Sequence, residues 1–204
     1  QMMIKKIVLS LLIFLFSSIF FNILEAAGTL EEQREKALGV KHKDYDSTST
    51  SRTKFIAEIE KGNLNKVKDF LKSNGNNLDF TVDGANPLTH AASINNLVIV
   101  EFFLNTTTIN IDVTDELGNT ALINASERGN IEIVDFLINK GADVNYQNNL
   151  GLTAVMKAAE KNNFFIAKLL LKNNADTTKS DYTGRTLREI VENNRDKKIL
   201  KLLN

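Results

Sequence analysis

A glycine followed two residues later by threonine recurs along the chain at a fixed spacing. Gly118, Gly151 and Gly184 lie 33 residues apart, and Gly84 lies 34 residues before Gly118. The threonines keep the same period, as Thr120, Thr153 and Thr186. A fixed period of this length predicts stacked repeats, because each unit is too small to bury its own apolar face. We therefore expect a series of similar units rather than one central core.

One full unit occupies residues 115–145. Its sequence predicts a turn, a short helix, a tight reversal, a second helix and a loop. The reversal needs a residue that tolerates a left-handed backbone, which Gly does best and Asn next best. Successive units carry such residues at equivalent positions: Gly62, Asn95, Gly129 and Asn162. The same backbone conformation is expected after the second helix, at Asn74, Gly141 and Asn174.

The order Gly-x-Thr-Ala-Leu, Gly-Asn, Ile-Val, a Leu pair and Gly-Ala-Asp-Val-Asn resembles the ankyrin repeat, over about residues 55–204. The resemblance implies an all-α ankyrin-repeat solenoid of about five helix-turn-helix units with short β-turn or hairpin loops. The units would span residues 53–80, 81–114, 115–147, 148–180 and 181–204. The first and last would be caps with a polar outer face. The last is expected to keep a second helix.

One feature of the ankyrin pattern is absent from the sequence. The family often has a His after the turn threonine, and the two side chains form hydrogen bonds between turn and helix. The His position holds Thr89, Ile123, Met156 and Glu189 in this chain. The resemblance therefore implies that these hydrogen bonds are missing.

The N-terminal segment is typical of a protein that leaves the cytoplasm. Lys5 and Lys6 precede residues 7–24, which are uncharged and mostly apolar, and small residues follow. Residues 1–28 are therefore predicted to be a signal peptide or, if uncleaved, an N-terminal membrane anchor. We expect an exported protein, periplasmic or secreted, or anchored in the inner membrane if the segment is retained. Residues 29–52 are polar, and the Ser- and Thr-rich stretch 47–51 predicts a flexible linker.

Composition and motifs limit the classes of function. The chain has 25 basic and 25 acidic residues, so it lacks the basic excess that favours nucleic acid or an anionic membrane surface. It has no Cys and two His, with no spacing typical of a metal site. None of the common catalytic or phosphate-binding motifs is present. We expect no catalytic residues, no metal and no cofactor.

The resemblance implies that the turn tips and the ends of the first helices form a concave protein-binding face. The candidate partner-binding residues are Leu117, Asn119, Arg128, Leu150, Leu152, Lys161, Tyr182 and Arg185. Apolar and aromatic residues at turn tips indicate an interface, because a monomer would place polar residues there. We expect a monomeric, non-enzymatic module that binds an unidentified protein. The alternatives are a secreted factor that acts on host or competitor proteins and a membrane-anchored structural scaffold.

Overall fold

The computed structural model describes residues 45–193 and 197–203 of the 204-residue chain. The predicted signal peptide or anchor and the first part of the predicted linker lie outside the described residues. Across the described part of the chain, the regular structure is helical and no strand occurs. Three isolated β-bridges join Val82 to Ala85, Thr114 to Thr120 and Ser180 to Thr186 in the turns.

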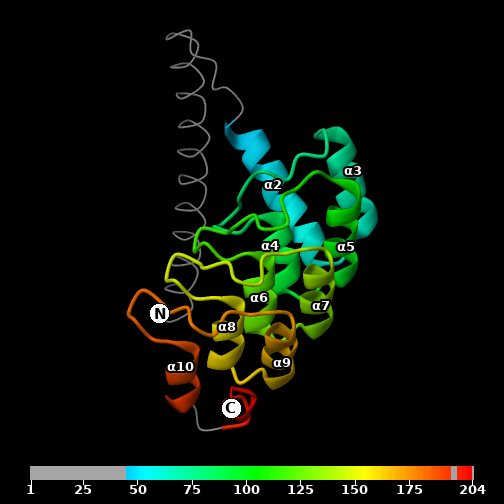
Figure 1. The fold of residues 1–204 in the computed structure, drawn as a ribbon. Coiled ribbons are helices and arrows are strands. Elements are labelled where there is room, and N and C mark those ends of the chain that lie inside the picture. The colour runs from blue at the N-terminus through cyan, green and yellow to red at the C-terminus, as the bar shows by residue number, and fades with distance from the viewer. Residues whose placement is uncertain (1–44, 194–196, 204) are drawn as a thin grey trace, which may run out of the picture. The chain divides into compact units, whose positions relative to one another are not determined.

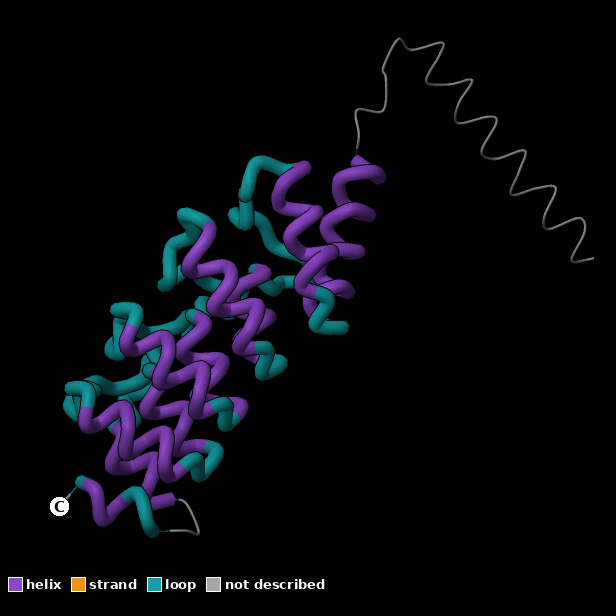
Figure 2. The backbone as a smooth tube through the Cα atoms, turned by 90° about the vertical axis from the view of Figure 1, so that its right-hand side faces the viewer, coloured by secondary structure: helices purple, strands orange, loops and turns teal. Residues whose placement is uncertain are grey.

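The helices come in successive pairs (Figures 1 and 2). The pairs are α2 (Tyr45–Glu60) with α3 (Leu64–Ser73), α4 (Pro87–Ser93) with α5 (Leu97–Thr106), α6 (Ala121–Arg128) with α7 (Ile131–Asn139), and α8 (Ala154–Glu160) with α9 (Phe164–Lys172). The last unit has α10 (Leu187–Asn193) and a 3-10 turn, η1 (Leu200–Leu202). The first helices contact one another in the order α4, α6, α8, α10, and the second helices in the order α5, α7, α9. The predicted all-α repeat solenoid is confirmed.

The apolar side of each second helix holds neighbouring units together. In α7, Ile133, Val134 and Leu137 are completely buried. Their spacing of one and four residues places them on one side of the helix. In α9, Ile166, Ala167 and Leu170 repeat the arrangement. One hydrophobic core therefore continues through the stack instead of closing within any unit.

The predicted reversals have the expected backbone. Gly62, Asn95, Gly129 and Asn162 have φ of 68°, 62°, 89° and 59°. After the second helices, Gly141 and Asn174 have φ of 89° and 63°, as predicted, but Asn74 has φ of −114°. Gly75 and Asn76 take the left-handed conformation in its place, at 68° and 59°. The prediction for Asn74 is wrong because α3 ends later, so its C-terminal turn shifts along the chain.

Amide side chains link each unit to the one before it. Asn130 Nδ2 donates to the carbonyl oxygens of Ala92 (2.8 Å) and Ser93 (3.4 Å), at the end of α4. Asn163 Nδ2 donates in the same way to Ser126 (2.8 Å) and Glu127 (3.2 Å) at the end of α6. The last carbonyls of a helix have no partner within the helix, and these amides satisfy them. We call the contacts of Asn130 and Asn163 the amide bridges.

The positions where the family often has His differ between the second and last units on the one hand and the third and fourth units on the other. In the second unit Thr89 Oγ1 accepts from the backbone N–H of Asn86 (3.1 Å) and donates to its carbonyl (2.9 Å). In the last unit a Glu189 carboxylate oxygen accepts from the N–H and hydroxyl of Thr186 (2.7 and 3.0 Å). The prediction of missing hydrogen bonds is therefore wrong for these two units. In the middle units the Ile123 and Met156 side chains are buried in the core and pack there instead. Their backbone N–H groups still donate to Thr120 Oγ1 (3.3 Å) and Thr153 Oγ1 (3.4 Å).

Both ends of the described chain differ from the expectation. The stretch 45–52, predicted to be linker, belongs to α2. This helix continues into Phe55 and Ile59, which are buried, and the Arg52 guanidinium lies 4.7 Å from the centroid of the Phe80 ring. These contacts stabilise a helix that its Ser and Thr residues alone would not predict. In the last unit the expected second helix is the short turn η1, which buries Ile199.

Candidate partner-binding surface

In the third, fourth and fifth units, one Asp or Asn side chain holds the turn tip by hydrogen bonds. Asp115 Oδ1 accepts from the backbone N–H groups of Leu117 (3.0 Å) and Asn119 (2.8 Å). Asn148 Oδ1 accepts from Leu150 and Leu152 (both 2.9 Å). Side-chain acceptors of this kind fix tight turns. Asp181 Oδ1 repeats the pattern with Thr183 and Arg185 (both 2.9 Å).

Backbone hydrogen bonds join neighbouring tips into one row. The N–H of Asn149 donates to the carbonyl of Leu117 (3.1 Å), and the N–H of Tyr182 donates to the carbonyl of Leu150 (3.0 Å). The approach is so close that a Cβ at Gly151 would lie 2.7 Å from Tyr182 Cδ1. Glycine at this position therefore serves two needs, a positive φ and room for the next tip.

Three large apolar or aromatic side chains stand exposed on this row. Leu117 is 68% exposed, Leu150 is 63% and Tyr182 is 73%. Leu117 and Leu150 occupy equivalent positions, while Tyr182 lies one position earlier in its unit, which brings its ring over Gly151. We call these three residues the apolar tip row. Their predicted exposure is confirmed.

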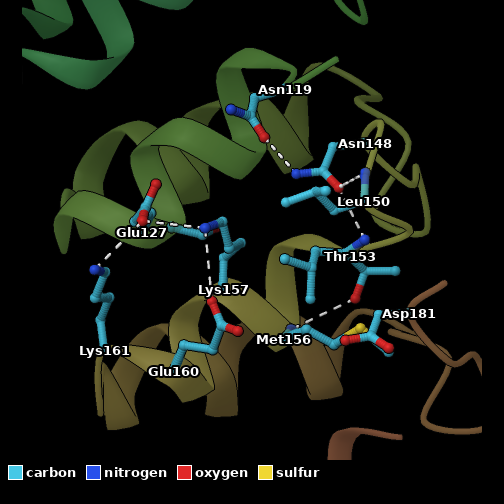
Figure 3. Close-up of polar contacts among 12 residues, drawn as sticks. Asn119, Glu127, Asn148, Leu150, Thr153, Met156, Lys157, Glu160, Lys161 and Asp181 are labelled. Atoms are coloured by element: carbon cyan, nitrogen blue, oxygen red, sulfur yellow. Dashed lines mark hydrogen bonds and ion pairs between the residues drawn. The ribbon is translucent and has the colours of Figure 1, made fainter. Parts of the chain in front are cut away.

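Two of the predicted contact residues are not on the surface. Asn119 and Leu152 are both buried. Asn119 Oδ1 accepts from Asn148 Nδ2 (2.7 Å), so its amide joins two adjacent units (Figure 3). Leu152 packs in the core. Both residues follow the turn glycine, where the chain already descends toward the first helix, so their prediction as exposed contact residues is wrong.

Charged side chains at the ends of the first helices form a connected set of ion pairs. The Lys157 ammonium lies 3.1 Å from Glu127 and 3.6 Å from Glu160, and Lys161 lies 3.5 Å from Glu127 (Figure 3). Arg185 lies 3.6 Å from Glu160 and 2.8 Å from Asp181. We call these six residues the inner ion-pair network. Its three acids and three bases balance, so Lys161 and Arg185 are already neutralised by the chain itself.

Arg128 differs from these two basic residues. It is exposed at the end of α6 and forms no ion pair with another described residue. Of the three predicted basic contact residues, Arg128 is therefore the one whose charge the fold leaves uncompensated.

Hydrogen bonds shift the ionisation of two carboxyl groups in this region. Burial opposes ionisation of Asp181, but hydrogen bonds from Thr183 and Arg185 outweigh it and lower its pKa to about 2. Burial also opposes ionisation of Glu127, while the hydrogen bonds and charges of Lys157 and Lys161 lower its pKa. Both carboxylates are therefore charged at neutral pH and hold their partners in place.

Among residues 45–193 and 197–203, no cluster of three or more His, Cys, Asp or Glu side chains is arranged to hold a metal ion. His90 lies at the first helix of the second unit, with Nε2 3.3 Å from Glu60. What the site presents is a row of exposed apolar groups beside a balanced set of charges.

Sequence reasoning missed two exposed apolar residues. Phe165 is 71% exposed and Val98 is 57% exposed, at equivalent positions in the first turns of α9 and α5. Both stand directly before the buried pair of their helix, where α7 has Glu132. Comparing this position across units could have found them.

The matches to known families agree with the geometry. Residues 55–148 match a family model described as ankyrin repeats in three copies, and residues 150–182 match the model of a single ankyrin repeat. No curated protein matches the chain. In the described part of the chain, no helix is both long and apolar enough to span a membrane. Ankyrin repeats generally mediate protein–protein interaction and are typically non-enzymatic. The chain belongs to the ankyrin repeat family.

Proposed function

We propose that this chain is a non-enzymatic binding module whose partner protein docks on the apolar tip row. The observation that carries the proposal is the exposure of Leu117, Leu150 and Tyr182, each more than 60%, on three successive tips. Aligned exposed apolar groups are typical of interaction sites. Tyr is also one of the residue types enriched among the few that dominate interface energy.

The rigidity of the row supports the same function. Each tip is fixed by a side-chain acceptor at its base and by a backbone hydrogen bond to a neighbouring tip. A surface held in its binding geometry loses little conformational entropy when a partner arrives. The row therefore presents its apolar groups ready for contact.

The charges beside the row define the polar rim of the proposed interface. Arg128 is available for a carboxylate of the partner, since it has no ion pair among the described residues. Lys161 and Arg185 can contact a partner only while sharing Glu127, Glu160 or Asp181. We therefore expect Arg128 to contribute more to specificity than either of them.

The test is a titration of a partner captured from the cell of origin. Truncating Leu150 and Tyr182 to Ala should weaken binding by about 2 kcal/mol or more, roughly 30-fold. The melting temperature should stay nearly unchanged, because both side chains are exposed. Val98→Ala is the matched control, an exposed apolar truncation outside the tips, and should leave the affinity unchanged. Loss of binding in the control but not in the tip variant would contradict the proposal.

We also propose that the module works outside the cytoplasm, in the periplasm or beyond the cell. The support is the sequence of residues 1–28, in which Lys5 and Lys6 precede an uncharged apolar run. Mass spectrometry of the protein from its cell should find an N-terminus near residues 27–29. Intact protein in the cytoplasm that retains the leader would contradict export.

A further inference from the structure

The side of the second helices that faces away from the core carries segregated charge. In α7 the exposed residues on this side are Glu132, Asp135 and Asn139, and in α9 the equivalent residues are Phe165, Lys168 and Lys172. Spacings of three and four residues place each set on one side of its helix. We call Glu132 and Asp135 the acidic stripe, and Phe165, Lys168 and Lys172 the basic stripe.

These charges lack ion-pair partners in the part of the chain that the structure describes. None of the four forms an ion pair with another described residue, although α7 and α9 are neighbours in the stack. Like charges three or four residues apart on a helix repel. The arrangement is the opposite of the inner ion-pair network, where every charge meets its counterpart. A pattern unfavourable for the isolated chain suits a partner that carries the complementary charges.

We propose that a second copy of this chain is that partner. A two-fold axis between α7 and α9 would bring the acidic stripe of one copy against the basic stripe of the other. The same two-fold rotation also brings the basic stripe of the first copy against the acidic stripe of the second, as an isologous interface requires. Opposite charges then meet twice, and this complementarity gives such an interface its specificity.

Phe165 supplies the apolar part of the contact. Its ring is 71% exposed at the start of the basic stripe and contacts Phe164 edge-on, with centroids 5.4 Å apart. Buried aromatic residues are common among those that dominate interface energy. In the dimer this ring is buried between the two copies and is no longer exposed to water. The dimer departs from the monomer expected from the sequence.

The dimer would leave the apolar tip row free. The loops that carry the tips lie on one side of α6 and α8, and α7 and α9 lie on the other (Figure 1). A dimer through the stripes would therefore present two tip rows. A partner with two binding sites could then be held more tightly than by either row alone.

The test is a charge exchange in the full chain, read as mass by analytical ultracentrifugation at low and high salt. The wild-type chain should form a concentration-dependent dimer that weakens as salt rises, because exposed ion pairs are screened. The variant Glu132→Lys with Asp135→Lys, and the variant Lys168→Glu with Lys172→Glu, should each lose at least about tenfold in dimer affinity. In a dimer of either variant alone, charges of the same sign would lie opposite one another.

An equimolar mixture of the two variants should recover the dimer. Both contacts of the mixed pair again join opposite charges. Lys66→Glu with Asp69→Lys, exposed on α3, is the control and should dimerise as the wild type does. A wild-type chain that stays monomeric at low salt, or a mixture no more dimeric than its components, would overturn the proposal. Association through the leader would also overturn it and would appear as dimers insensitive to all four changes.

This test is independent of the proposed function. The double truncation of Leu150 and Tyr182 changes the tips and should leave the dimer intact, while the charge exchange should leave the affinity of each tip row for its partner unchanged. Either proposal can therefore fail alone.

Discussion

The contacts between repeats and the tips of the same repeats distribute polar and apolar side chains in opposite ways. Between repeats, amides lie inside: Asn163 is half-buried against the end of α6, and Asn148 is buried against Asn119. At the tips, Leu117 and Leu150 stand in solvent. The usual rule that apolar residues lie inside is reversed at both places. The amides join neighbouring units by hydrogen bonds, and we propose that the exposed apolar groups contact a partner.

The two regions should respond differently to mutation. Removing a buried amide leaves helix carbonyls without a hydrogen-bond partner, which costs roughly 1–3 kcal/mol. Removing an exposed side chain usually changes stability by less than about 0.5 kcal/mol.

The largest effect is expected in the core of the third unit. Leu137 is completely buried, so Leu137→Ala should destabilise the protein by about 2–5 kcal/mol in urea unfolding. Leu150→Ala removes the same atoms from an exposed tip and should cost less than about 0.5 kcal/mol. Similar losses at the two positions would contradict the difference between core and tip.

The amide bridge of the fourth unit should have an intermediate effect. Asn163→Ala removes the hydrogen bonds to Ser126 and Glu127 and should cost roughly 1–3 kcal/mol. Asn149→Ala is the matched control, because Asn149 Nδ2 also donates to a carbonyl of the preceding unit, Glu116 (3.0 Å), but at an exposed tip. Thermal or urea unfolding of both variants would measure the difference. Equal losses would show that burial does not decide the strength of these contacts.

A smaller effect is expected from pH at the last tip. The pKa of Asp181 is about 2, below its ordinary value of 3.8, so the ionised carboxylate stabilises the folded chain. This stability is present above about pH 4 and is lost as the pH falls toward 2. Asp181→Asn should reduce the acid sensitivity measured by urea unfolding between these values. The fourth tip shows that an amide can serve, since Asn148 makes the equivalent hydrogen bonds without titrating. An unchanged pH profile would mean that Asp181 does not contribute.

The features that were predictable from sequence are those fixed by local chemistry. The left-handed reversals at Gly129 and Asn162 follow from the backbone preferences of Gly and Asn. The repeat period follows from the recurring glycines and threonines. The paired helices and the exposed tips follow from the resemblance to the ankyrin repeat. None of these depends on how one unit packs on the next.

The features that were missed depend on that packing. Asn119 and Leu152 occupy equivalent places after the turn glycine, and both are buried. Asn119 accepts a hydrogen bond from Asn148 of the next unit, and Leu152 belongs to the core that continues through the stack. The amide bridges have a signature in the sequence, because Asn recurs at the repeat period, as Asn63, Asn96, Asn130 and Asn163. Asn63, with no described unit before it, donates to Glu58 in its own unit (2.9 Å) instead. The short η1 was not predictable, because the apolar spacing around Ile199 and Leu203 also fits an α-helix.

The most direct test of the central claim is to locate the partner on the surface. A photoreactive amino acid in place of Leu117 would sit on the apolar tip row, at a position that the truncations of Leu150 and Tyr182 leave untouched. The same group in place of Val98 would sit at a comparably exposed site on α5. After illumination in the cell of origin, the protein substituted at position 117 should be cross-linked to its partner, and the protein substituted at position 98 should not. Cross-linking of the partner from position 98 and not from position 117 would show that the tips are not the binding surface.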